Sequence, residues 1–284
     1  MRERPSGAAN AALERPVDGR RAFVDLHVHT SASFDSLASP ESQVKAAAAR
    51  GLTHLAITDH DTIDGALAAQ AYVAREGLGV AILVGQEVRT SSGDLIAVFL
   101  REAIESGLAP AAAIAAIRAQ GGLVGIPHPF DKYRGSLLAG SESTADARDA
   151  ADEEASADSA LAPGSTGGVG PAQLAPLVDW VEAHNARIMV GDGNERAAAF
   201  AREHGLPGVA VSDAHSTLEL GVAYVVLGGD PSTPDGLIAA LPTAELVTGR
   251  ATYFVRAVTP VAKVVQWARG RGRRAPTGGT KALP

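Results

Sequence analysis

Short apolar runs alternate with alanine-rich stretches along most of the chain. The runs are rich in β-branched residues and have the length of buried strands; they include AFVDLHV, HLAIT, VAILVGQEV, LIAVFL, LVGIP, VDWVEA, VAVSD and AYVVLG. The stretches between them, such as PESQVKAAAAR and IDGALAAQAYVAREG, have the composition and the boundary residues of helices. This alternation predicts an α/β fold with a parallel sheet. Roughly seven such units favour closure into a barrel, and a doubly wound open sheet is the alternative, since periodicity does not separate the two.

Three segments depart from this alternation and suggest the domain organisation. Residues 1–20 are polar and aperiodic, so we expect a flexible lead-in before one domain at 21–260. Residues 139–170 consist of Ala, Ser, Gly and acidic residues with almost no large apolar side chain, and therefore predict a disordered or mobile insertion. Residues 261–284 hold the end of a helix, VAKVVQWA, and a basic tail, RGRGRRAPTGGTKALP.

Composition and charge narrow the setting. The chain has 284 residues, no cysteine and a net charge of −7, so disulfides, thiolate metal sites and cysteine nucleophiles are excluded. The first residues lack the apolar core of a signal peptide, and no apolar run approaches the roughly 18 residues of a membrane helix, so we expect a cytoplasmic protein without a membrane partner. Residues 139–170 hold seven acidic residues and one arginine, and therefore account for nearly all of the net charge. The rest of the chain is compatible with an anionic substrate.

Side chains that bind metals follow the predicted strands. His27 and His29 lie two apart at the end of the first strand, so both project to the same side and can bind one divalent ion. Further candidates stand after later strands or in the loops that follow them: Asp35, His60, Glu87, His128, Asp213 and His215. Each has an ordinary structural explanation by itself, such as a capping aspartate or a core histidine. Together they predict a site for several metal ions, because the carboxyl ends of parallel strands meet at one end of such a fold.

The motifs DLHVHTSASFDSLASP, LAITDHD, GQE, PHPFDKYR and SDAH occur in this order over about residues 22–230. In this combination the chain resembles the PHP (polymerase and histidinol phosphatase) superfamily, above all its stand-alone bacterial phosphoesterases. The resemblance implies a distorted (β/α)7 barrel with two or three divalent ions that hydrolyses phosphoesters. The implied metal ligands are His27, His29, Asp35, His60, Glu87, His128, Asp213 and His215.

One further position departs from the family pattern. Members of the family often carry a histidine in the strand after the glutamate, and Asp94 stands at the matching place here. An aspartate can replace the imidazole as an oxygen ligand of a third ion. The pair Gly93–Asp94 is equally typical of a hairpin turn, so both interpretations stay open.

The donor types indicate the ions and the chemistry. Nitrogen and oxygen donors without sulfur favour Mn²⁺, Zn²⁺ or Fe²⁺, and the many imidazoles disfavour Mg²⁺. Such a centre lowers the pKa of a bridging water to about 7 and supplies a hydroxide that attacks phosphorus in line. His215, Asp59 and Asp61 are the candidates for proton transfer. Asp25 and Asp59 are expected to orient ligand imidazoles.

A phosphate substrate also needs fixed donors. Arg134 and Lys132 follow the PHPFD turn and are the first candidates, with Asn185 and Arg187 at another strand end as the second. Solvated loop charges are the alternative interpretation of the first pair.

We therefore expect a metal-dependent phosphoesterase that acts on a small phosphomonoester, with a nucleotide or nucleoside bisphosphate as the favoured substrate. A histidinol-phosphate phosphatase shares the same metal centre, and a catalytically silent PHP interaction module is the alternative of another class. Short oligonucleotides are also candidate substrates, although the basic tail, without interleaved aromatic residues, is a weak signal for nucleic acid. The sequence does not determine the oligomeric state.

Overall fold

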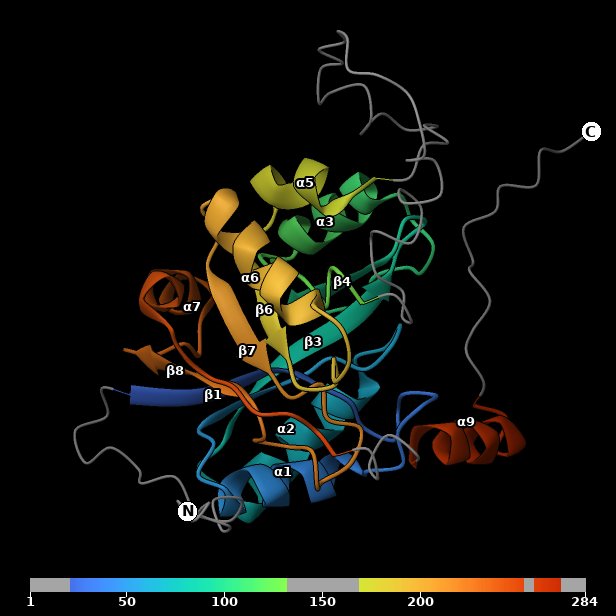
Figure 1. The fold of residues 1–284 in the computed structure, drawn as a ribbon. Helices are drawn as coiled ribbons and strands as arrows, with labels where there is room; N and C mark the ends of the chain where they lie inside the picture. Colours follow the sequence, from blue (N-terminus) through green and yellow to red (C-terminus); the bar gives the residue numbers. More distant parts are fainter. Residues whose placement is uncertain (1–20, 132–168, 253–257, 272–284) are drawn as a thin grey trace, which may run out of the picture.

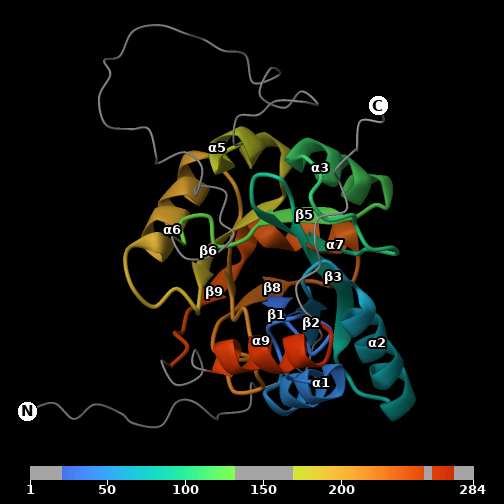
Figure 2. The same ribbon diagram turned by 90° about the vertical axis from the view of Figure 1, so that its right-hand side faces the viewer.

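The computed structural model describes residues 21–131, 169–252 and 258–271, and Figure 1 shows how their elements are arranged. The elements, in chain order, are β1 (Arg21–Val28), α1 (Pro40–Ala49), β2 (His54–Ile57), α2 (Asp64–Glu76), β3 (Ala81–Arg89), β4 (Asp94–Val98), α3 (Pro110–Ala119), β5 (Leu123–Ile126), α5 (Pro171–Leu174), η2 (Ala175–Leu177), β6 (Trp180–Asn185), α6 (Gly193–Glu203), β7 (Gly208–Val211), β8 (Tyr224–Gly228), α7 (Pro234–Ala240), η3 (Leu241–Thr243), β9 (Glu245–Val247) and α9 (Val258–Ala268). Strands and helices alternate as expected, and the helices lie around the outside of the sheet (Figure 2).

The boundaries of the helices follow from local sequence. Helix α1 begins with Pro40, and the hydroxyl of Ser39 accepts a hydrogen bond from the backbone N–H of Ser42. Helix α7 begins in the same way, with Pro234 after a Thr233 cap. Helix α2 ends at Gly77, whose φ of 65° is a left-handed conformation that glycine adopts without steric cost.

The nine strands form one sheet in the order β7-β6-β5-β4-β3-β2-β1-β8-β9. The expected parallel pairing holds for β1 with β2, β2 with β3, β5 with β6, and β6 with β7. Strand β4 is antiparallel to both of its neighbours, and β8 is antiparallel to β1 and β9. The parallel sheet expected from the alternation is therefore wrong at β4 and β8, and between β3 and β4 the reason is a short turn before Asp94 in place of a helical crossover.

The sheet closes into a distorted barrel, which confirms the expected fold class. One buried cluster of apolar side chains takes members from every strand between β1 and β8, including Val24, Leu83, Ile96, Trp180 and Val225. Strands so far apart in the sheet order share a core because the sheet curls around it. A single parallel bridge between Val28 and Ala214, with a hydrogen bond of 2.9 Å from the N–H of His29 to the carbonyl of Ala214, connects β1 to the segment that follows β7.

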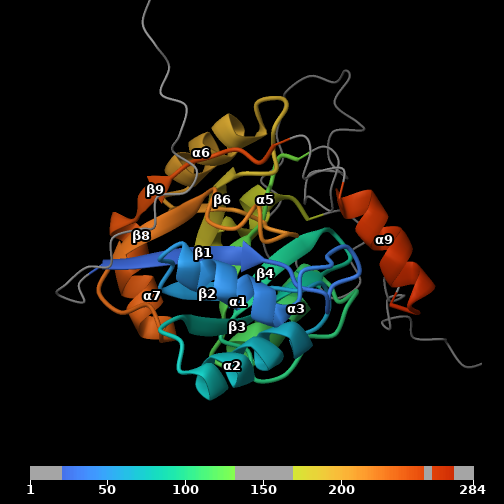
Figure 3. The ribbon, with the colours of Figure 1, turned by 90° about the horizontal axis from the view of Figure 1, so that it is seen from below.

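Helix α9 lies beyond the carboxyl end of β1 (Figures 1 and 3) and crosses the domain boundary expected at residue 261. The side-chain amide of Gln266 is buried there and donates to the backbone carbonyls of Ser31, Ser33 and Ser36 at 2.9, 3.1 and 2.8 Å. This one side chain ties α9 to the loop between β1 and α1.

The expectations for 1–20, for nearly all of the 139–170 insertion and for the tail after residue 271 lie outside the described residues. Within the described ranges, every helix is too short or too polar to cross a membrane.

Gly125 of β5 provides a stability test of the barrel core. A Cβ atom at this position would lie 2.3 Å from the indole ring of Trp180, which is itself only 1% exposed. We expect Gly125→Ala to lower the free energy of unfolding by about 1–3 kcal/mol, because the packed ring cannot move away. Urea unfolding of the metal-free chain measures this effect, with Gly170→Ala, where a Cβ meets nothing within 4 Å, as the control. Equal stability of the two variants would contradict the fit described here.

Candidate metal centre

Eight chemistry-bearing side chains meet at the carboxyl ends of the barrel strands. They come from β1, β3 and the loops after β1, β2, β5 and β7: His27, His29, Asp35, His60, Glu87, His128, Asp213 and His215. All but His60 are buried, and the side chain of His60 is only 12% exposed. The structure thus brings together eight of the nine predicted ligands.

His27 and His29, at the end of β1, lie next to each other within this cluster. A register shift of β1 between Asp25 and Val28 interrupts its pairing with β2, a type of irregularity that re-aims side chains next to functional sites. The Nε2 atoms of the two imidazoles are 2.9 Å apart. Nδ1 of His27 is hydrogen-bonded to Glu182 at 2.6 Å, so its Nε2 atom faces the cluster.

Glu87 of β3 joins the parts of the cluster. Its Oε2 atom lies 3.3 Å from Nε2 of His27, 3.3 Å from Nε2 of His29 and 3.3 Å from Nδ1 of His60. Its Oε1 atom lies 3.2 Å from Nε2 of His128. One carboxylate therefore contacts four imidazoles that come from three different segments of the chain.

Asp35 and Asp213 supply the other carboxylates. Asp35 Oδ2 lies 3.2 Å from Nε2 of His60 and 3.2 Å from Nε2 of His215. Asp213 Oδ1 lies 3.5 Å from Nε2 of His29 and 3.5 Å from Nδ1 of His215. Six of the eight donors fall into two overlapping groups that share His29, one with Asp35, His60 and His215 and one with His27 and Asp213. Glu87 and His128 lie outside these two groups.

The backbone around the cluster holds conformations that ordinary residues avoid. His128 has a φ of 27°, Asp213 a φ of 52°, and Asp61, next to His60, a φ of 56°. Such left-handed geometry in non-glycine residues costs free energy and persists where surrounding contacts enforce it, often at functional sites.

Electrostatics inside the cluster are dominated by the carboxylates. Burial alone lowers the pKa of His60, but the charges of Glu87 and Asp35 outweigh it and raise that pKa to about 10. Burial raises the pKa of the Glu87 carboxyl, yet the neighbouring imidazoles His60 and His27 hold it well below its ordinary value. Imidazoles likewise hold the pKa of Asp35 well below its ordinary value, so Glu87 and Asp35 stay ionised, and the raised pKa values of His27, His29 and His60 keep protons on the imidazoles beside them.

His215 is the exception among these histidines. Burial and the positive charge of Arg187 lower the pKa of its imidazole to about 3, so the ring is neutral at ordinary pH. Its Nδ1 atom is 2.9 Å from the backbone carbonyl of Asp213, which leaves Nε2 toward Asp35. A neutral ring with a directed nitrogen suits metal binding better than proton donation.

This donor set fits divalent transition ions. Imidazole nitrogens and carboxylate oxygens converge, and two Nε2 atoms face each other at 2.9 Å, a distance at which two lone pairs repel unless a proton or cation lies between them. Nδ1 of His128 is also buried without a hydrogen-bond partner among the described residues.

Comparison with known proteins identifies the family. A model of the PHP domain matches residues 25–147, and a model described as PHP-associated matches residues 191–245. The chain belongs to the PHP family. An uncharacterized protein of Methanocaldococcus jannaschii is 37% identical over 116 residues, which cover 37% of this chain and 67% of that protein. The expected superfamily is thereby confirmed.

Two further similarities bear on the fold and on one segment. A two-domain protein from Bacteroides vulgatus, which contains a predicted PHP-like metal-dependent phosphoesterase, superimposes with a TM-score of 0.61 at 16% identity, over 86% of this chain and 70% of that one. A 5′-3′ exoribonuclease of Salmonella typhimurium is 44% identical over 66 residues, which cover 23% of this chain and 22% of that protein. The family and the fold agree with the expected class, a metal-dependent hydrolase.

The ninth predicted ligand of this PHP chain, Asp94, lies beside the cluster and outside both donor groups. It is 4% exposed, and its negative charge contributes to the raised pKa of His60. It is also the first residue of β4, directly after Gly93 with a φ of 141°. The ligand role and the turn role expected from the sequence are both compatible with this place.

The acidic residues expected to transfer protons or orient imidazoles have other contacts. Asp59 accepts hydrogen bonds of 2.5 and 2.6 Å from the backbone N–H and the hydroxyl of Thr30. Asp25 accepts from the backbone N–H groups of Ser212 and His27, so it contacts the main chain and not the ring of His27. Asp61 accepts from the backbone N–H of Arg89 at 3.2 Å.

Of the four predicted phosphate-binding residues, two lie outside the described residues and two are buried. Lys132 and Arg134 lie outside the described residues. Asn185 is 0% exposed, and its amide donates to Glu182 at 2.8 Å and to Asp213 at 3.0 Å, so these side-chain contacts are with residues in and directly behind the cluster. Arg187 is buried beside His215, and its NH1 atom has no hydrogen-bond partner among the described residues.

Glu182 is the functional residue that the sequence analysis missed. Its Oε1 atom accepts from the His27 ring, and its Oε2 atom accepts from the N–H of His128 at 2.9 Å and from Asn185 at 2.8 Å. The available signal was a charged residue inside the apolar run VDWVEA, where an unpaired carboxylate is costly.

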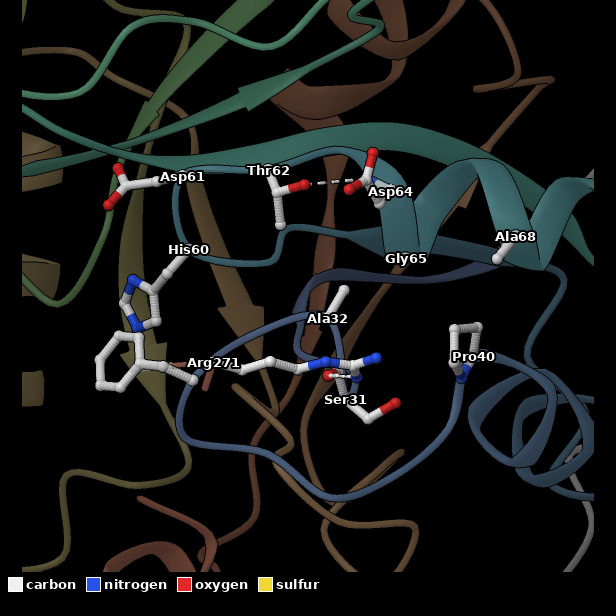
Figure 4. Close-up of a pocket in the computed structure, with 11 residues that line it drawn as sticks. Ser31, Ala32, Pro40, His60, Asp61, Thr62, Asp64, Gly65, Ala68 and Arg271 are labelled. Carbon is white, nitrogen blue, oxygen red and sulfur yellow. Dashed lines mark hydrogen bonds between the residues drawn. The ribbon is translucent and has the colours of Figure 1, made fainter. Parts of the chain in front are cut away.

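A pocket of about 300 Å³ opens next to this centre (Figure 4). His60 and Asp61 lie at one end, Pro40 and Ala68 at the other, and Arg271 reaches between them. The pocket therefore lies between the metal cluster, the start of α1, the first turns of α2, and Arg271, which follows shortly after the end of α9.

Glu182→Gln tests how the PHP centre is held together. Glu182 uses both carboxylate oxygens, one for the His27 ring and one for the backbone N–H of His128. A glutamine side chain has only one oxygen that accepts hydrogen bonds, so we expect metal affinity to fall about 10- to 100-fold. Titration with Mn²⁺ or Zn²⁺ and metal analysis of the purified chain measure this loss. Glu195→Gln is the matched control on exposed helix α6. Unchanged affinity in Glu182→Gln would refute the positioning role.

Metal binding is expected to strengthen with rising pH. The pKa of His60 is about 10, so this ring carries a proton throughout the neutral range, and an ion must displace that proton to reach the nitrogen. We expect affinity to increase from about pH 6 to about pH 8, with net proton release. Calorimetry in buffers of different ionisation enthalpy measures the released protons, and pH-independent binding without release would contradict this electrostatic account.

Proposed function

We propose that this PHP-family chain is a metal-dependent phosphoesterase that hydrolyses a small phosphomonoester, with a nucleotide or nucleoside bisphosphate as the favoured substrate. The observation that carries the proposal is the convergence of eight nitrogen and oxygen donors at one end of the barrel. The donors come from the ends of β1 and β3 and from the loops after β1, β2, β5 and β7, an arrangement that packing of a core does not require.

Two or three divalent ions fit the donor set. Eight side chains exceed the four to six donors of a single transition ion, so one ion leaves buried carboxylates uncompensated. Mn²⁺, Zn²⁺ and Fe²⁺ all accept mixed imidazole and carboxylate ligands. Asp94, beside His60, is the candidate ligand that distinguishes three ions from two.

When bound, such ions activate water and neutralise phosphate oxygens. The chain's own residues then have defined tasks. Glu182 and Asn185 hold His27 and Asp213 in place. Arg187, a buried cation beside His215, is positioned to stabilise the anionic phosphate, because its NH1 atom lacks a partner among the described residues. Asp61 borders the pocket and remains the candidate for proton transfer to the leaving group.

The pocket supports a small substrate. Its volume, about 300 Å³, is at the lower end of the range for small-molecule sites. The ring of Phe34 lines it and packs against His60 with a centroid distance of 4.9 Å, so an aromatic side chain borders the pocket next to the metal centre, as a nucleotide site requires. The similarity of one segment to an exoribonuclease also favours a nucleotide leaving group. Histidinol phosphate is the runner-up, because its imidazole would suit the same surface.

A phosphate-release screen with Mn²⁺ tests the proposal. The panel comprises 5′-nucleotides, nucleoside 3′,5′-bisphosphates, histidinol phosphate and p-nitrophenyl phosphate. We expect turnover of a nucleotide substrate, and a loss of at least about 1,000-fold in His27→Ala/His29→Ala, because metal-bound water and phosphate neutralisation are lost together.

Two outcomes would overturn parts of this proposal. Turnover of histidinol phosphate alone would replace the substrate class. Purified chain that binds no divalent ion, or shows no turnover above the double variant, would favour the catalytically silent module. His54→Ala is the matched control, because His54 lies at the start of β2 and bonds to Ser232 at 2.9 Å, away from the cluster.

A further inference from the structure

Helix α9 exposes an apolar face that no described residue covers. Val261, Val264 and Trp267 recur at three-residue spacing and are 57%, 66% and 75% exposed. The opposite face, with Ala262 and Gln266, is buried against the β1–α1 loop. The helix is therefore fixed in place while its largest side chain lies in solvent. The chain's other tryptophan, Trp180, is 1% exposed in the barrel core.

The same part of the chain carries a concentration of positive charge. Residues 250–284 contain eight lysines and arginines and no acidic residue, although the whole chain has a net charge of −7. Four of these residues are described and exposed, namely Arg250, Lys263, Arg269 and Arg271, and the last three lie on α9 or shortly after it. Lys263 thus precedes Trp267 on the same helix, and Arg269 and Arg271 follow it in the sequence.

This surface is continuous with the pocket beside the metal centre. Arg271 lines the pocket, and its NH1 atom donates to the carbonyl of Ser31 at 3.3 Å (Figure 4). Lys263 Nζ lies 5.5 Å from the ring centroid of Phe34, which in turn packs against His60. A line of aromatic and cationic side chains therefore runs from the cluster to the exposed helix.

We propose that α9 and the adjoining pocket wall bind a single-stranded nucleic acid. A nucleobase stacks on Trp267, and the backbone phosphates contact Lys263, Arg269 and Arg271. The strand then lies with one terminal phosphate toward the metal cluster, a detail that rests on the proposed phosphoesterase function. Alternating aromatic and cationic contacts suit a single strand because they match its alternating bases and phosphates.

Charge selects this occupant over a second copy of the chain. Pairing of two α9 helices through their apolar faces would bring the lysine and arginines of both copies together, and like charges at close range repel. An anionic vesicle could satisfy the same charges, but a helix fixed by Gln266 at a pocket mouth favours a ligand that enters the pocket.

The test measures binding separately from hydrolysis. Fluorescence anisotropy follows labelled ten-nucleotide uridine and thymidine strands with phosphorothioate linkages, which resist cleavage, added to the Mn²⁺-loaded full-length chain. We expect Trp267→Ala to weaken binding at least about five-fold and Trp267→Phe to retain most of it. Arg271→Ala should reduce the slope of log affinity against log salt concentration by about one.

Matched controls lie on other exposed helices. Ile238→Ala on α7, 45% exposed, and Arg75→Ala on α2 remove an apolar and a cationic side chain far from α9 and should leave binding unchanged. Wild-type binding by Trp267→Ala would overturn the inference. So would an effect of Trp267→Ala confined to sedimentation of the chain or to binding of phosphatidylserine vesicles, which would assign the face to self-association or to a lipid surface.

Two failures remain distinguishable. Hydrolysis of small phosphomonoesters without strand binding refutes the nucleic-acid surface and leaves the phosphoesterase function. Strand binding that depends on Trp267, without hydrolysis of any phosphoester, refutes the proposed function and leaves the surface.

Discussion

The structure depends on the cost of burying several carboxylates and imidazoles within a few ångströms of one another. The carboxylates of Glu87, Asp35 and Asp213 lie against the imidazoles of the cluster, in a region that is almost inaccessible to water. Buried acids at this density require compensating positive charge, and Glu87 and Asp35 accordingly raise the pKa of His60 to about 10. In the metal-free chain, protonated imidazoles supply this positive charge. A divalent ion supplies more positive charge at each site. The cluster therefore favours bound cations independently of any substrate.

A second layer of contacts makes this arrangement rigid. Glu182 contacts the side chain of His27 and the backbone of His128, while Thr30 and Asp59 fix the loops after β1 and β2. A Cβ atom at Gly65 would lie 2.0 Å from the Asp59 carboxylate, so the first turn of α2 packs directly on this pair. Left-handed backbone at His128 and Asp213 shows that local conformational preference yields to these contacts.

The barrel separates stability from function in space. Apolar side chains from β1 to β8 fill the interior, and the polar cluster occupies the carboxyl ends of the strands. The loops after β1 and β2 carry Asp35 and His60, and these two loops also form the pocket wall that extends toward α9. Gln266 matters to both regions, because it holds the Asp35 loop and fixes the helix that presents Trp267.

Local sequence patterns determined the strand and helix elements and the eight candidate metal ligands, because strand ends and the loops after them are recognisable from short motifs such as DLHVH and SDAH. It did not determine pairing direction, since the short turn before Asp94 and a helical crossover both connect apolar strands. Nor did it identify Glu182, whose partners are separated from it by up to 155 residues along the chain. The exposure of Trp267 is likewise a tertiary property, because the helix pattern alone does not say which face the β1–α1 loop covers. Residue types decided which chemistry the chain can perform; closure of the sheet decided which side chains meet, because those contacts join segments that are distant in sequence.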